Sequence, residues 1–247
     1  MKTITFTSDF GTNDWFTAAV KGEIIKIAGD VRVIDITHSI APFDIRGAAF
    51  LLYAVYNNFP KGTIHLAVID PGVGGQRKPI IVDSSGHYFV GPDNGLFSYI
   101  YTPESEVYVI NASEATSQTF HARDIFGPTA AHLANGALPE QLGKKVLDHE
   151  RFDVPRVKKQ GDRYRGEIVY IDHFGNCITN VQNHAELSEI CVSGHHISVK
   201  ESYGDGQANE LVCVKGSIGY YEIAVYRGSA REQLQARVGM SIDGVKS

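Results

Sequence analysis

The sequence predicts two domains: an α/β domain with a largely parallel sheet at residues 1–150, and a smaller, barrel-like all-β domain at 161–247. Up to about residue 150, strand-like and helix-like segments alternate, which is typical of α/β folds. Beyond it, short strand-like runs are separated by Gly or Asn turns, which is typical of all-β domains. The segment 148–162 is charged, contains a proline and lacks a clear apolar period, so we expect the domain boundary there.

The α/β domain begins with a βαβαβ order. Strands are expected at 3–7, 31–36 and 64–69, with helices at 14–28 and 44–57. Apolar residues recur at helical spacing in both helical segments, and Asp14 stands where a helix N-cap belongs. Because parallel strands need crossover connections, this order implies a sheet covered by helices on both faces.

Further elements are expected after the third strand. Shorter strands are predicted at 80–82 and 88–90, and a helix at 124–135, with Asp124 near its start and Gly136 after its end. In the second half, strands are expected at 165–171, 177–181, 196–199, 211–214 and 221–226. Short strands at this spacing predict a small antiparallel barrel or sandwich.

The composition describes an ordinary globular protein, with 43% hydrophobic and 21% charged residues in a chain of 247. A formal net charge of −5 argues against a nucleic-acid partner, because phosphate binding needs a basic face.

The most apolar segment, 48–56, is too short to span a bilayer, and no secretory signal precedes the first strand, so no membrane partner is expected. Three widely spaced cysteines without a CxxC pair predict neither a zinc cluster nor a disulfide scaffold, and favour a cytoplasmic location.

The most informative stretch follows the strand at 64–69. Asp70 comes first, then a turn of Pro and three glycines, then Arg77. In an open α/β sheet, ligands bind beyond the carboxyl ends of the strands, and glycines there allow close approach to the backbone. Asp70 and Arg77 could both face one ligand, or they could form an ordinary surface ion pair. Arg77 occupies the third glycine position of G-x-G-x-x-G, which excludes a nicotinamide-dinucleotide fingerprint.

Three other polar positions stand at predicted strand or helix ends. Asp9 closes the first strand, where a carboxylate suits the two hydroxyls of a ribose or, alternatively, caps the following turn. His121 precedes a predicted helix and is either a catalytic or a structural histidine. The segment 172–176 offers an aromatic face and an amide that could bind a purine, or it forms a plain β-turn. The histidines show no metal-ligand spacing, so no metal is expected.

Six segments are more specific together, in this order, than any of them alone. They are 7–11 (TSDFG), 35–40 (DITHSI), 68–74 (VIDPGVG), 91–96 (GPDNGL), 120–124 (FHARD) and 171–176 (IDHFGN). With these segments the chain closely resembles the S-adenosyl-L-methionine (SAM) hydrolases, also called SAM hydroxide adenosyltransferases, which are relatives of the SAM-dependent chlorinases and fluorinases. The resemblance covers nearly the whole chain and is densest up to about residue 180.

The resemblance implies that Asp70, Arg77 and His121 form a catalytic triad. It also implies a homotrimer in which SAM, the substrate, binds without a cofactor between the N-terminal domain of one subunit and the C-terminal domain of its neighbour. The substrate contacts implied in this way are Asp9 for the ribose diol, Asp14 for the methionine amino group, Phe43 and Phe120 in the pocket, Asp172, Phe174 and Asn176 around the methionine and adenine ends, Ser217 for methionine, and Tyr226, Ser229 and Ala230 over adenine.

Two positions depart from the family pattern. Tyr226 stands where an asparagine is expected, which puts the adenine contact there in question. Ile218 stands where the halogenases have the arginine that binds the methionine carboxylate.

The expected chemistry needs a well-placed nucleophile more than an acid. Methionine leaves the sulfonium of SAM as a neutral thioether, and positioning water in line with the C5′–S bond can lower a barrier by ~7–11 kcal/mol. Asp70 and His121 would orient and partly deprotonate this water, with Arg77 keeping Asp70 ionised or binding incipient hydroxide. The sequence leaves open which of the two is the base.

Hydrolysis of SAM to adenosine and L-methionine is the predicted function. Halogenation is disfavoured because the carboxylate of Asp70 would repel a halide, whereas the resemblance places a neutral tyrosine there in the fluorinases. Two other functions stay open from the sequence. One is cleavage at C1′ of a nucleoside, which would release free adenine. The other is a SAM-binding sensor with incidental turnover.

Overall fold

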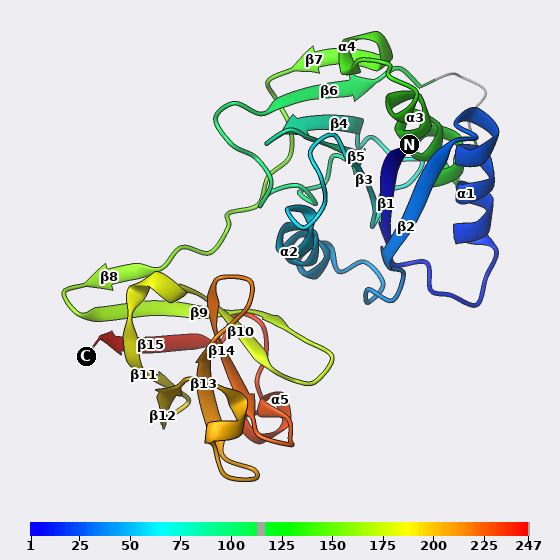
Figure 1. Cartoon of the computed structure of the whole chain (residues 1–247). Helices are drawn as coiled ribbons and strands as arrows, with labels where there is room; N and C mark the ends of the chain where they lie inside the picture. The colour runs from blue at the N-terminus through cyan, green and yellow to red at the C-terminus, as the bar shows by residue number, and fades with distance from the viewer. Residues whose placement is uncertain (113–116, 247) are drawn as a thin grey trace. The chain divides into compact units, whose positions relative to one another are not determined.

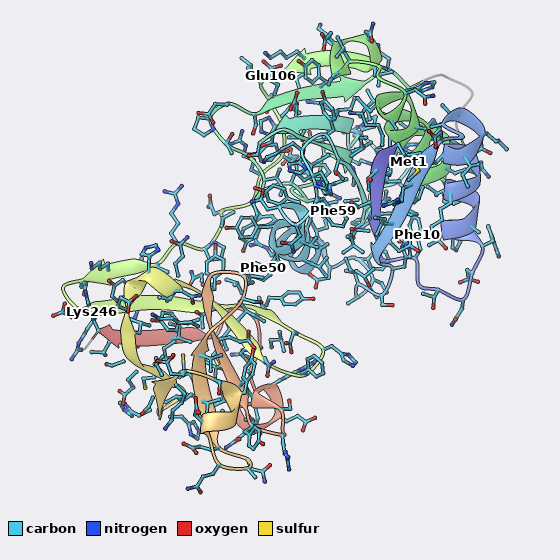
Figure 2. All side chains as sticks on the ribbon, in the orientation of Figure 1. Met1, Phe10, Phe50, Phe59, Glu106 and Lys246 are labelled. Atoms are coloured by element: carbon cyan, nitrogen blue, oxygen red, sulfur yellow. The ribbon has the colours of Figure 1, made fainter. Side chains whose placement is uncertain are left out.

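The computed structural model describes residues 1–112 and 117–246, and its contacts divide the chain into two units, Met1–Asp153 and Val154–Ser247 (Figure 1). The first unit is a sheet with helices and the second an all-β barrel, so the predicted fold class is confirmed. Side chains fill the space between helices and sheet and the interior of the barrel (Figure 2). Among the described residues, no helix has the length and apolar character needed to cross a membrane.

Seven strands form a mixed sheet in the first unit, in the order β2-β1-β3-β5-β4-β6-β7. Their bounds are β1 Lys2–Ser8, β2 Val31–Thr37, β3 Ile64–Val68, β4 Pro79–Ser84, β5 His87–Pro92, β6 Glu106–Ile110 and β7 Gly143–Val146. The expected parallel arrangement holds for β2, β1, β3 and β5, and the remaining pairs are antiparallel. The chain reverses direction between β4 and β5, where Ser85 and Gly86 both have positive φ and form a tight two-residue hairpin turn.

Helices cover both faces of this sheet, as predicted. They are α1 Phe16–Ile27, α2 Ile45–Tyr56, α3 Gly127–Ala134 and the short α4 Pro139–Leu142. Alternate side chains of β3 serve opposite faces: Leu66 and Val68 pack in one apolar cluster with α1 and α3, whereas Ala67 packs in the other with α2. The carboxyl end of β3 is therefore held between two packed layers.

Two helix starts differ from the prediction. Helix α1 begins at Phe16 with Trp15 as its N-cap residue, so the prediction that Asp14 caps it is wrong. Asp14 lies one position too early, in an exposed loop. The helix expected at 124–135 is preceded by a π-helix, Ala122–Phe126, because the Gly127 N–H donates to the Ala122 carbonyl rather than to a carbonyl four residues back.

The second unit is a closed barrel rather than a sandwich. Its strands are β8 Lys158–Gln160, β9 Arg163–Ile171, β10 Cys177–Gln182, β11 Leu187–Val192, β12 His195–Lys200, β13 Leu211–Lys215, β14 Tyr220–Val225 and β15 Ser241–Lys246. The order β10-β14-β13-β12-β11-β15-β9 closes through the pairing of β9 with β10, and β8 extends it at β9. All these pairs are antiparallel except β12 with β13. A short helix, α5 Ala230–Leu234, follows β14.

A buried histidine pair lies among the aromatic side chains of the first unit. His65 Nδ1 is 2.8 Å from Thr5 Oγ1, and His65 Nε2 is 3.2 Å from His87 Nδ1. The two histidines are 0% and 1% exposed. Burial lowers the pKa of His65 to about 3 and also lowers that of His87. Both rings are therefore neutral at pH 7.

This pair predicts that the folded chain loses stability in mild acid. An unfolded histidine has a pKa near 6.5, so between pH 6.5 and about 3 the unfolded state binds more protons. The contribution of His65 is complete above pH 6.5 and is lost as the pH falls, by up to ~1.4 kcal/mol per pH unit. In urea titrations from pH 7 to 4.5, His65→Asn should show a shallower pH dependence than wild type. The exposed His173→Asn serves as the control, and equal slopes for wild type and His65→Asn would contradict the prediction.

Candidate active site

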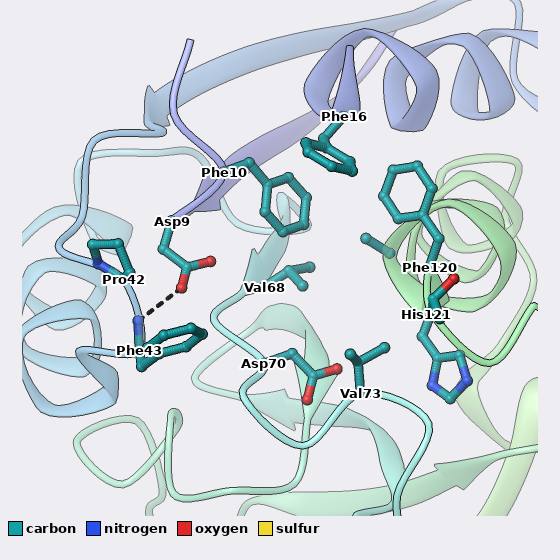
Figure 3. Close-up of a pocket in the computed structure, with 12 residues that line it drawn as sticks. Asp9, Phe10, Phe16, Pro42, Phe43, Val68, Asp70, Val73, Phe120 and His121 are labelled. Atoms are coloured by element: carbon teal, nitrogen blue, oxygen red, sulfur yellow. Dashed lines mark hydrogen bonds between the residues drawn. The ribbon is translucent and has the colours of Figure 1, made fainter. Parts of the chain in front are cut away.

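A cavity of about 430 Å³ opens at the carboxyl ends of β1 and β3 in the first unit (Figure 3). Its lining is mostly apolar, with a few polar groups, as in many small-molecule sites. The residues that line it are Asp9, Phe10, Phe16, Pro42, Phe43, Val68, Asp70, Val73, Thr119, Phe120, His121 and Ala122. The cavity thus lies at the edge where ligands bind in open α/β sheets.

Arg77 holds the two other members of the expected triad. Its Nε donates to Asp70 Oδ1 at 2.9 Å and to Oδ2 at 3.0 Å, and its Nη2 donates to Oδ2 at 2.5 Å. The same Nη2 lies 2.6 Å from His121 Nδ1. Only 9% of the Arg77 side chain and 6% of the Asp70 side chain are exposed. The guanidinium carbon also lies 5.3 Å from the centre of the Phe126 ring. The structure therefore brings Asp70, Arg77 and His121 together in one buried network.

This network fixes the protonation of His121. Guanidinium nitrogens donate only, so His121 Nδ1 accepts from Arg77 and the ring proton lies on Nε2. Burial, together with the positive charge of Arg77, lowers the pKa of His121. Since Asp70 and His121 both line the cavity, they supply it with a carboxylate acceptor and a neutral imidazole that carries its proton on Nε2.

The turn that follows Asp70 is built on glycine. Gly74 has a φ of +75°, and a Cβ on it would lie 2.3 Å from the carbonyl oxygen of Gln118. A side chain would push the turn away from the segment that leads into the π-helix. On the strand side, Asn94 Nδ2 donates to the Ile69 carbonyl at 2.9 Å. Both contacts determine where the Asp70 backbone lies.

Asp9 and Phe43 form one wall of the cavity. The Phe43 N–H donates to Asp9 Oδ2 at 2.9 Å, and the other carboxylate oxygen points into the cavity (Figure 3). Phe43 has a φ of +69°, a strained conformation for a residue other than glycine, and is 68% exposed. The contact with Asp9 is one interaction that holds this strained residue at the mouth of the cavity.

Three phenylalanines form the opposite wall. The ring centroids of Phe16 and Phe120 are 5.4 Å apart, those of Phe10 and Phe16 are 5.8 Å apart, and those of Phe10 and Phe120 are 6.3 Å apart. Phe120 was expected here from the sequence, whereas Phe10 and Phe16 were missed. The available signal was the aromatic residues that follow the first strand and open the first helix.

The segment after β9 in the second unit is both a turn and an aromatic platform. Asp172 Oδ1 accepts from the Phe174 N–H at 2.9 Å and from the Asn176 N–H at 2.8 Å, while Asn176 Nδ2 donates to Asp172 Oδ2 at 3.0 Å. The carboxylate of Asp172 therefore stabilises its own turn. Phe174 is presented outward and is 74% exposed.

A separate pocket of about 500 Å³ lies beside this turn. The residues that line it are Phe174, Asn176, Tyr203, Val225, Tyr226, Arg227 and Gly228. Tyr203 was missed because it lies in a loop some 30 residues from the turn in the sequence. Its hydroxyl donates to Glu222 Oε1 at 2.7 Å, which anchors that loop to β14.

Comparison with known proteins matches both units to one family. Residues 4–143 match the SAM hydroxide adenosyltransferase N-terminal domain, and residues 166–243 match the C-terminal domain. This chain belongs to the SAM hydroxide adenosyltransferase family.

The similarity to other family members extends over the full length. The (R)-S-adenosyl-L-methionine hydrolase of Thermus thermophilus is 35% identical over 255 residues, which cover 98% of this chain and 99% of that protein. A crystal structure of an uncharacterized conserved protein from Thermotoga maritima superposes with a TM-score of 0.90 at 31% identity, covering 98% and 100% of the two chains. The fluorinase of Actinopolyspora mzabensis is 27% identical, covering 99% and 97%.

In this SAM hydroxide adenosyltransferase, the expected substrate contacts fall into three groups. Asp9, Phe43 and Phe120 line the first cavity, and Phe174, Asn176 and Tyr226 line the pocket of the barrel. The others line neither: they are Asp14, Asp172, Ser217, Ser229 and Ala230. Within the described residues, no cluster of three or more His, Cys, Asp or Glu side chains is placed to hold a metal ion.

Three of the residues in the last group have clear structural positions. Ser229 is the N-cap of α5 and accepts from the Glu232 N–H at 3.2 Å. Ala230 is fully buried. Ser217 lies in the turn between β13 and β14, at the opposite end of β14 from Tyr226.

The glycine turn yields a stability prediction. Gly74→Ala combines an unfavourable positive φ with a backbone clash, so it should lower the free energy of unfolding by about 3 kcal/mol. Gly136→Ala is the matched control: its φ is +94° but nothing lies within 4 Å of the added Cβ, so about 1 kcal/mol is expected. Urea unfolding at pH 7 measures both. Equal losses in the two variants would show that the contact with Gln118 is unimportant.

Proposed function

We propose that this chain hydrolyses SAM to adenosine and L-methionine through attack of a water on C5′. The observation that carries the proposal is the buried network in which Arg77 binds Asp70 and His121 at the edge of the cavity. The aromatic wall suits the positive charge of a sulfonium, because ring faces attract cations. Full-length similarity to a protein named as a SAM hydrolase supports the same substrate.

Asp70 is the base that the geometry favours. His121 Nδ1 is occupied by Arg77 and Nε2 carries the proton, so neither ring nitrogen is free to accept a proton from water. A water held between them would accept a hydrogen bond from His121 Nε2–H and donate one to Asp70. A carboxylate is a much weaker base than hydroxide, so the water is only partly deprotonated when it attacks. Partial deprotonation is sufficient, because methionine is a good leaving group that departs as a neutral thioether.

Hydrogen bonding also selects water over halide. The expected repulsion between Asp70 and a halide is weakened here, because Arg77 neutralises much of the carboxylate charge. A halide has no proton to donate to Asp70, however, and would leave the carboxylate facing an anion. A water satisfies both Asp70 and His121, so the paired network favours hydrolysis.

The test is product analysis with purified protein, SAM and chloride in oxygen-18 water. Both sulfonium epimers are supplied, because the Thermus thermophilus relative is named for the (R) form. The expected products are methionine and adenosine labelled at its 5′ oxygen. A 5′-chlorinated nucleoside would indicate a halogenase, free adenine would indicate cleavage at C1′, and tightly bound, unchanged SAM would indicate a sensor.

Variants in the same assay test the residue roles. Asp70→Asn and Arg77→Lys should lower kcat by about 10²–10⁴-fold while SAM still binds, because both change the group that positions the water. Arg165→Lys is a matched control, since Arg165 forms an exposed ion pair with Asp243 in the barrel. Wild-type turnover in Asp70→Asn would contradict the assignment.

We further propose a homotrimer in which each active site combines the first unit of one subunit with the barrel of a neighbour. The apolar ring of Phe174 and the exposed ring of Phe43 support this, because each leaves a large aromatic surface for a ligand or partner. A cytoplasmic location is proposed with it, on the ground that Cys177, Cys191 and Cys213 are all free thiols. Light scattering should give about 81 kDa, three times the 27.1 kDa chain.

Subunit mixing tests whether the site is shared. Asp70→Asn inactivates the first unit, and the double variant Phe174→Ala/Asn176→Ala impairs the barrel pocket. When the two chains are co-expressed in equal amounts, random assembly should restore about a quarter of wild-type turnover, since one site in four combines two intact halves. A mixture no more active than its separate components would show that each site lies within one chain.

A further inference from the structure

A second polar network lies outside the triad and joins β1 to β2. Ser8 Oγ is 2.7 Å from His38 Nδ1, and His38 Nε2 lies 3.2 Å from Asp35 Oδ1. Lys21 of α1 donates to Asp35 Oδ2 at 2.6 Å. Ser8 is 0% and His38 is 7% exposed. The network accounts for the DITHSI segment at 35–40, which the proposed chemistry does not use.

Ser8, His38 and Asp35 are the residue types of a serine-hydrolase triad, but they do not act as one: His38 faces Ser8 through Nδ1 rather than Nε2. A nucleophilic serine must expose its oxygen to a substrate. Ser8 is fully buried, and the cavity is lined by its neighbour Asp9 instead. The network must therefore act by holding neighbouring residues of the cavity in position.

The contacts of Ser8 and His38 hold the backbone around Asp9. His38 Nε2 lies 3.2 Å from Asp35 Oδ1 without hydrogen-bond geometry, so the hydrogen bond that holds the ring is the one between its Nδ1 and the Ser8 hydroxyl. Ser8 Oγ is in turn 3.4 Å from the Phe10 N–H, and the Gly11 N–H donates to the His38 carbonyl at 2.8 Å. These contacts hold the backbone on both sides of Asp9.

His38 also begins the loop that supplies Phe43, which forms one wall of the cavity together with Asp9. The chain runs from His38 to Phe43, whose N–H donates to Asp9 Oδ2. The His38 ring packs edge-on against Phe6 of β1, with centroids 4.7 Å apart. One buried side chain thus fixes the loop after β1 and the loop after β2 relative to each other.

We propose that His38 is a positioning residue for the ribose end of the substrate. By joining the ends of β1 and β2, it holds Asp9 and the Phe43 backbone in the arrangement that receives the two ribose hydroxyls. This inference rests on the proposed function, because it takes the ligand of Asp9 to be the ribose of an adenosyl compound.

The test compares two equivalent hydroxyl–histidine pairs on β1. Ser8→Ala removes the hydroxyl that contacts His38. Thr5→Val removes the hydroxyl that contacts His65 in the core, away from the residues that line the cavity. Calorimetry measures the Kd for adenosine, and steady-state kinetics measure KM and kcat for SAM.

Ser8→Ala should raise the Kd for adenosine and the KM for SAM about tenfold, with kcat within about threefold of wild type. The kcat is spared because the ribose contact is present in both the ground state and the transition state. Thr5→Val should lower stability without changing Kd or KM. His38→Asn, which keeps a hydrogen-bonding group near Ser8, should bind adenosine more tightly than His38→Leu.

Two results would overturn the proposal: a folded Ser8→Ala chain with wild-type affinity for adenosine, or the same loss of affinity in Thr5→Val. Failure of the proposed function gives a different pattern. A wild-type chain that binds adenosine but does not hydrolyse SAM contradicts hydrolysis alone, and the comparison of the two pairs still decides the role of His38. A wild-type chain that binds neither compound contradicts both.

Discussion

The guanidinium of Arg77 is the group on which the first cavity depends. It is a permanent cation with little access to water, and such a charge is tolerated inside a protein only when it is paired. Asp70 supplies the opposite charge through a two-pronged contact, and His121 accepts from one of the same nitrogens. One planar group therefore sets the position of two neighbours and the protonation of the imidazole. The glycine turn and the π-helix bring the three side chains to this common centre.

Periodicity explains which parts of the fold could be predicted from the sequence. Strands β1, β2 and β3 are apolar runs between amphipathic helices, so the pattern of residues predicted the α/β order. Strand β7 is only four residues long and carries two lysines, and β8 is three exposed polar residues, so neither contains an apolar run; β6, β11 and β15 were also missed. Closure of the barrel depends on the pairing of β9 with β10, and the sequence pattern predicted either a barrel or a sandwich.

The site was predictable as a set of motifs, not residue by residue. Asp70 and Arg77 alone could have been a surface ion pair, and His121 alone a structural histidine; their common motif order indicated a site. No spacing in the sequence reveals that Arg77 contacts both partners or which nitrogen of His121 carries the proton. No role was predicted for Tyr203 or His38, for a related reason. Tyr203 contacts Glu222 and His38 contacts Ser8, and both contacts join residues far apart along the chain.

The π-helix at Ala122–Phe126 makes the site sensitive to chain length as well as to side-chain identity. A π-turn holds one residue more than an α-turn, so deleting any one of these five residues would let α3 extend back to His121 as a regular helix. The imidazole would then be displaced by about 100° around the helix axis, away from Arg77. A homologue one residue shorter at this point could keep the aspartate, the arginine and the histidine and still lack the network that they form here.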